Sequence, residues 1–187
     1  MRAVILFTLG WIVYPVWLLA GVGDQWCHRR TSIATTSGRL ESLLHLAQLG
    51  VIGLAVLGGL FLEPSTALFS MLAILIASHS VLSFIDVSYT EPRRRILPIE
   101  QHIHAYMEVL PWTSLALFCA AHPAMFTQPE WALRLRTEPL PVTVLLAVIA
   151  PAVLLAVLPA LFEYFHTRRE SARPPRASYA RPASAQP

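Results

Sequence analysis

Residues 79–108 read HSVLSFIDVSYTEPRRRILPIEQHIHAYME, and they join the end of one strongly apolar segment to the start of another through a short basic turn. Glu100, His104 and Glu108 stand four residues apart, so on a helix they form one stripe that rises about 6 Å per step. His79 and Asp86 are seven residues apart and also share a helix face. Ionisable side chains within apolar helices are costly to bury, so this stretch predicts a functional site.

The composition of the chain indicates a membrane protein. It has 187 residues, of which 55% are hydrophobic and only 13% charged, whereas a soluble domain has about a quarter charged. The length fits one helical bundle without a second folded domain. The net charge of +3 comes from arginines gathered in loops, a pattern that does not indicate nucleic-acid binding. Two cysteines near opposite membrane faces, Cys27 and Cys119, are not expected to form a disulfide.

Five apolar segments are long enough to cross a bilayer, which requires about 20 residues each. We predict an all-α integral membrane bundle over residues 1–166, with spans near 3–22, 40–62, 66–88, 99–121 and 140–165. The first span also resembles a cleaved signal peptide, although it is longer than the usual apolar core and no clear cleavage site follows it. Residues 167–187 are rich in Arg, Pro, Ala and Ser, and they predict a disordered cytoplasmic tail.

The arginines predict the orientation of this bundle. In a five-span arrangement, 11 of the 14 basic residues fall on one side, and such an excess is typical of the cytoplasmic face. The amino terminus is therefore expected outside, the carboxyl terminus inside, and the protein in a bacterial inner membrane. The residues on the cytoplasmic side are Arg29, Arg30, Arg39, Arg93, Arg94, Arg95, Arg168, Arg169, Arg173, Arg176 and Arg181.

This topology brings a carboxylate and a histidine from each of four helix ends to the same leaflet. Carboxylates and imidazoles are ligands of iron and zinc, and helix bundles present them from facing helices. Motifs of zinc proteases, serine hydrolases and P-loop enzymes are absent from the sequence. Acids and histidines at other helix ends and in loops, Glu163 among them, are interpreted as solvated. The predicted metal ligands are Asp24, His28, Glu41, His45, His79, Asp86, Glu100, His104 and Glu108.

The leading hypothesis is a metal-dependent membrane enzyme that acts on a lipid-like substrate at the cytoplasmic leaflet. With iron it would be an oxygenase or desaturase. With zinc it would be a hydrolase, in which Glu108 or Glu100 serves as the catalytic base. Arg93 and Arg94 are predicted to hold an anionic headgroup of the substrate.

Two other classes fit the same residues. One is a b-type haem electron carrier with axial ligands such as His45 and His104. The other is a non-catalytic accessory protein whose carboxylates pair with the neighbouring arginines in a structural network. The sequence does not determine the metal, the substrate, the oligomeric state or the role of His102.

Two stretches carry a family resemblance. Residues 24–46, DQWCHRRTSIATTSGRLESLLHL, and 93–111, RRRILPIEQHIHAYMEVLP, resemble a family of small multi-pass membrane proteins of proteobacteria for which no activity is established. The likeness covers about residues 20–115, and PIEQHxH is its most specific part. It implies the membrane class and no particular chemistry. This chain has Ser80 where the family pattern leads us to expect an acidic residue after His79.

Overall fold

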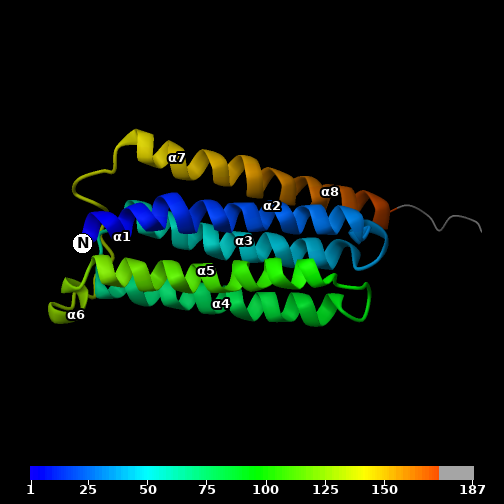
Figure 1. The fold of residues 1–187 in the computed structure, drawn as a ribbon, viewed down its shortest axis with the longest axis horizontal. Helices are drawn as coiled ribbons and strands as arrows, with labels where there is room; N and C mark the ends of the chain where they lie inside the picture. Colours follow the sequence, from blue (N-terminus) through cyan, green and yellow to red (C-terminus); the bar gives the residue numbers. More distant parts are fainter. Residues whose placement is uncertain (173–187) are drawn as a thin grey trace, which may run out of the picture.

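The computed structural model describes residues 1–172 and shows a bundle of five long helices packed side by side (Figure 1). No strand occurs within residues 1–172. The first long helix comprises α1 (Arg2–Thr8), a π-helical segment η1 (Leu9–Val13) and α2 (Tyr14–Arg30). Then follow α3 (Gly38–Phe61), α4 (Thr66–Thr90) and α5 (Pro98–Ala121). The last comprises α7 (Val142–Ala152), a second π-helical segment η3 (Val153–Val157) and α8 (Leu158–Ser171). A 3₁₀ turn η2 (Ile33–Thr35) and the four-residue α6 (Ala124–Thr127) lie in the connections.

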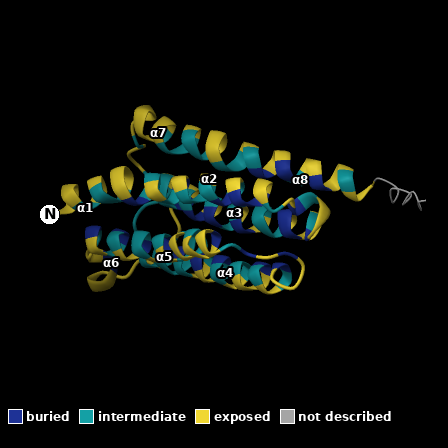
Figure 2. Cartoon of the chain, turned by 45° about the vertical axis from the view of Figure 1, so that its right-hand side comes forward, coloured by how far each residue is buried: buried dark blue, intermediate teal, exposed yellow. Residues whose placement is uncertain are grey.

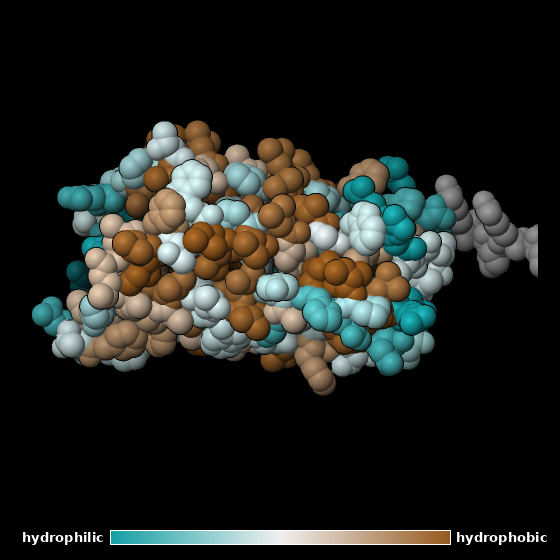
Figure 3. Space-filling model, viewed as in Figure 1, coloured by the Kyte–Doolittle hydropathy of each residue, from teal (hydrophilic) through white to brown (hydrophobic). Residues whose placement is uncertain are grey.

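Four of the five long helices are long and apolar enough to cross a membrane. The exception is α5, whose 24 residues are long enough but whose first half carries Glu100, His102, His104 and Glu108. The all-α membrane class predicted from composition is therefore confirmed, and the five predicted segments appear as five long helices. Figure 3 shows apolar side chains over the middle of the bundle and hydrophilic ones toward its ends, as expected of a surface that faces lipid.

Two predicted boundaries are wrong. The first helix continues to Arg30, so Asp24 and His28 lie on a helix rather than in a connection. At the other end α8 continues to Ser171, and Thr167 is fully buried, so the tail does not begin at residue 167. The rest of the predicted tail, residues 173–187, lies outside the described residues.

Both π-helical segments end two residues before a proline. The segment η1 ends at Val13 ahead of Pro15, and the segment η3 ends at Val157 ahead of Pro159. A proline ring collides with the carbonyl four residues earlier, and a wider turn relieves that collision. Two of the long helices thus keep their direction despite an internal proline.

Apolar and polar buried residues occupy different halves of the bundle. An apolar core packs α3, α4 and α5 together at the end near α6, through residues such as Ile52, Leu72 and Phe118. There Arg136 closes the C-terminal end of α3: its Nε and Nη2 donate to the carbonyls of Leu60 and Gly59, each at 2.9 Å. The buried acids and histidines gather toward the other end. Figure 2 shows buried stretches on the inward faces of the helices beside largely exposed outer faces.

Candidate metal centre

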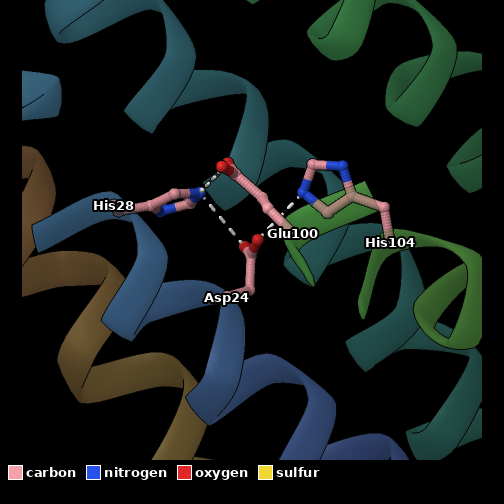
Figure 4. A group of neighbouring side chains, drawn as sticks. All are labelled: Asp24, His28, Glu100 and His104. Atoms are coloured by element: carbon pink, nitrogen blue, oxygen red, sulfur yellow. Dashed lines mark hydrogen bonds and ion pairs between the residues drawn. The ribbon is translucent and has the colours of Figure 1, made fainter. Parts of the chain in front are cut away.

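Two helices supply the first ligand group, and each contributes a pair of residues one turn apart. Asp24 and His28 lie on α2, and Glu100 and His104 lie on α5 (Figure 4). One ligand atom from each residue falls within 4.8 Å of all the others, as the donors around one metal ion do. Asp24, His28 and Glu100 are buried, and His104 is partly buried. The spacing of four predicted from the sequence therefore does place these groups on facing stripes.

Gly23 lies where α2 and α5 pack closely. A Cβ at Gly23 would lie 3.0 Å from Cδ1 of Ile103, so the end of that side chain would have to shift by a few tenths of an ångström. Gly23 directly precedes Asp24, and Ile103 directly precedes His104. The contact between the two helices therefore lies beside the ligand group.

Asp24 bridges two imidazoles with its two oxygens. Its Oδ2 lies 3.3 Å from Nε2 of His28, and its Oδ1 lies 2.9 Å from Nε2 of His104 (Figure 4). One carboxylate therefore connects the histidine of α2 with the histidine of α5.

A second ligand group shares His28 with the first. It consists of His28, Glu41 and His45, of which the last two lie one turn apart on α3. The His28 and His45 rings stack with centroids 4.4 Å apart and an angle of 5° between their planes. The two groups therefore form one continuous cluster rather than two separate sites.

His28 has one ring nitrogen that points into a ring of acids. Its Nε2 lies 3.3 Å from Asp24, 3.8 Å from Glu100 and 4.0 Å from Glu41, and the side chain is fully buried. Within the described residues this buried nitrogen has no hydrogen-bond partner of good geometry. Three carboxylates around an unpaired nitrogen repel its lone pair, so a positive charge is needed there. A metal ion or a proton on Nε2 would supply it.

Glu163 on α8 orients both stacked histidines. Its Oε2 lies 3.0 Å from Nδ1 of His28, and its Oε1 lies 3.2 Å from Nδ1 of His45 and accepts a hydrogen bond from Ser42. For His28, a carboxylate that accepts from Nδ1–H leaves Nε2 as the ligand atom, which is the usual support of metal-bound histidine. Nε2 of His45 instead lies 3.0 Å from Asp86. The interpretation of Glu163 as solvated is therefore wrong, since it is buried in the cluster. Its depth from the helix end, similar to that of the other acids, was the signal in the sequence.

Arg94 clamps two of the acids. Its Nε and Nη2 donate to Glu41, the latter at 2.6 Å, and its Nη1 and Nη2 donate to Glu100. Burial alone would lower the pKa of this guanidinium, but the hydrogen bonds and charges of Glu100 and Glu41 raise it above its ordinary value. With its side chain 2% exposed, Arg94 is not available to a lipid headgroup, and that prediction is wrong.

The acids of the cluster outnumber its possible cations. Five buried carboxylates surround one buried arginine and three histidines, so even with every imidazole protonated one negative charge would remain in excess. Uncompensated charge inside a low-dielectric bundle is strongly unfavourable. Additional cations or protons are therefore needed. The five carboxylates belong to Asp24, Glu41, Asp86, Glu100 and Glu163.

Three predicted ligands lie outside both groups. Asp86 accepts from Gln48 at 3.1 Å and lies 3.0 Å from Nε2 of His45, so it supports a histidine at the edge of the cluster. His79 and Glu108 belong to neither group found among residues 1–172. Glu100, predicted as a base, has both oxygens engaged by Arg94, whereas Oε2 of Glu108 is buried without a hydrogen-bond partner among the described residues.

Both cysteines are free, as predicted.

Comparison of the chain with protein-family models, curated proteins and solved structures found no match. The site itself therefore carries the functional argument.

Proposed function

We propose that this chain is an integral membrane metalloprotein whose bundle holds divalent iron or zinc between α2, α3 and α5. The observation that carries the proposal is Nε2 of His28, a buried nitrogen that has no hydrogen bond of good geometry among the described residues and lies within 4.0 Å of three carboxylates. A divalent cation there would use the nitrogen as a ligand and offset the excess of negative charge. The donor set of carboxylates and imidazoles fits both metals.

The proposed activity is a metal-dependent reaction on a lipid-like substrate. The metal would supply Lewis acidity or, with iron, redox chemistry, and Glu108 is the better of the two proposed bases because its Oε2 is unpaired. Of the two arginines assigned to a headgroup, only Arg93 stays exposed, and it stacks on Tyr89 at 3.7 Å. A membrane lipid is the substrate class that such an arrangement would meet first.

The proposed location is a bacterial inner membrane, with the cluster near the cytoplasmic leaflet. Support comes from the arginines Arg29, Arg30, Arg93 and Arg95, which lie around the end of the bundle that carries the cluster. Periplasmic placement of that end would oppose the usual distribution of positive charge.

Haem binding is less well supported. An axial ligand needs one free ring nitrogen, but both nitrogens of His45 face carboxylates, Glu163 at 3.2 Å and Asp86 at 3.0 Å. A structural network is the stronger alternative because Arg94 already pairs two of the acids. It would require protons in place of the metal.

Elemental analysis of the full chain, purified in mild detergent without added metal, tests the proposal. We expect near-stoichiometric iron or zinc, or saturable uptake of either ion by protein stripped with a chelator. His28→Ala should lose the metal. Absence of metal both as purified and after titration would overturn the proposal, as would unchanged metal in the His28→Ala variant.

A matched pair on α5 controls for general damage. His104→Ala removes a group that lies 2.9 Å from Asp24, and it should lower metal content. His102→Ala removes an exposed ring two residues away, whose Nδ1 contacts the carbonyl of Pro98, and metal content should not change. Equal metal in the two variants would remove His104 from the ligand set.

A further inference from the structure

A cavity of about 80 Å³ lies directly against the cluster, on the side toward the middle of the bundle. All five long helices line it, from α2 around to η3 and α8. A site for one ordered water needs roughly 10–15 Å³ on this measure, so the cavity has room for several water-sized groups. It is too small for a headgroup or for a folded acyl chain.

The lining of the cavity contains both polar and apolar side chains. Asp24, His45, Asp86 and His104 belong to the cluster. Gln25, Gln48 and Ser83 are further polar residues, and the apolar ones include Trp17, Leu18, Leu49 and Met107. A ligand in this cavity would therefore meet candidate metal ligands as well as apolar groups.

Charge selects against an anion in this cavity. The cluster already holds more carboxylates than cations, so an anion would be repelled by the side it has to approach. An anion or a cation would also have to leave water for a cavity inside an apolar bundle, which is strongly unfavourable. A small uncharged molecule meets neither penalty, and it can reach the cavity through the lipid.

His79 adds a second polar observation within the same cavity. It lines the space from α4, is 3% exposed, and its Nδ1 has no hydrogen-bond partner among the described residues. An unpaired ring nitrogen at this depth is unfavourable in the empty bundle. A polar atom of a bound molecule would satisfy it.

We propose that this cavity is a ligand chamber, in which an uncharged molecule of a few non-hydrogen atoms, about the size of dioxygen, reaches the cavity-facing side of the metal centre. The inference rests on the proposed metal site and adds the size and charge of what that site takes. His79 lines the same cavity and offers the second polar contact. The lipid-like substrate would then approach from outside the cavity.

Nitric oxide is the probe for this chamber, because it is diatomic, uncharged and gives a spectroscopic signature on ferrous iron. Gly21 lines the cavity, and a Cβ there would meet nothing within 4 Å, so Gly21→Leu fills the space without an immediate clash. Gly50→Leu is the matched control, since Gly50 also has open space around its Cβ but is exposed on α3. Each protein is stripped, loaded anaerobically with ferrous iron and titrated with nitric oxide.

We expect equal iron in the three proteins, with nitrosyl formation in the wild type and the Gly50→Leu variant at the same concentration. In Gly21→Leu, nitrosyl formation should need at least about tenfold more nitric oxide. Equal titrations in all three would overturn the chamber and leave the metal site intact. Failure of the wild type to take up iron would overturn the chamber, and failure to take up zinc as well would overturn the metal site.

Two further measurements cover loss of iron from the Gly21→Leu variant and binding of an anion in the cavity. If Gly21→Leu loses iron, Ala156→Leu fills the cavity from η3 instead and decides the question by the same titration. Excess azide, a small anion, should leave the nitrosyl signal unchanged, and its displacement of nitric oxide would overturn the assignment of an uncharged ligand.

Discussion

Replacement of Glu163 by Gln is the sharpest test of the metal centre, because it alters no proposed ligand. The glutamate accepts from the Nδ1 atoms of His28 at 3.0 Å and His45 at 3.2 Å, one on each oxygen. Glutamine keeps the shape but has only one acceptor oxygen, and its amide NH₂ donates. With the amide NH₂ toward His28, that ring must accept at Nδ1 and carry its proton on Nε2, the atom needed by the metal.

The expected magnitude follows from this change of tautomer. Loss of a carboxylate that orients a metal-bound histidine lowers metal affinity by about 10- to 100-fold. That factor corresponds to roughly 1.4–2.8 kcal/mol of binding free energy. Because one glutamate serves two rings here, we expect the upper part of this range.

Competition with a chelator of known affinity measures the change in detergent solution. Glu138→Gln is the control, since Glu138 is exposed in the connection before α7. It should bind metal as the wild type does. Wild-type affinity in Glu163→Gln, within about twofold, would refute the role of Glu163 as an orienting carboxylate. Lower thermal stability with no metal bound by either protein would favour the structural network instead.

Three further outcomes are expected. Arg94→Met leaves Glu41 and Glu100 without their buried partner and should destabilise the metal-free protein by about 3–5 kcal/mol. The unfolding temperature should fall, and added metal should partly restore it. An unchanged unfolding temperature would show that the contacts of Arg94 are not needed for stability. Metal affinity should fall as the pH decreases from about 7.5 to 5.5, because protons compete with the metal for imidazole nitrogens and carboxylates. A chelator titration at each pH measures the affinity. An affinity that does not change with pH would speak against histidine ligation. Arg136→Ala removes the cap on α3 at the other end of the bundle, so it should cost about 1–2 kcal/mol of stability and leave metal content unchanged.

The helices and their residue pairs were predictable because both depend on local sequence. Runs of about 20 apolar residues define the long helices, and a spacing of four places Asp24 with His28, and Glu100 with His104, on one helix face each. Arginine placement indicated that these pairs share one end of the bundle. A mixed carboxylate and imidazole cluster at that end followed from these patterns alone.

Only the tertiary structure decided which faces meet. Periodicity defines a stripe on a helix but not the neighbour toward which that stripe is rotated, nor the depth at which the helices are aligned. The packing of α2 against α5 brings Asp24 to His104, whereas His79 and Glu108, on equally regular stripes, lie outside both ligand groups. Glu163 is brought to His28 and Arg94 to Glu41 by the packing of segments distant in sequence, although Arg94 also holds Glu100 only six residues away.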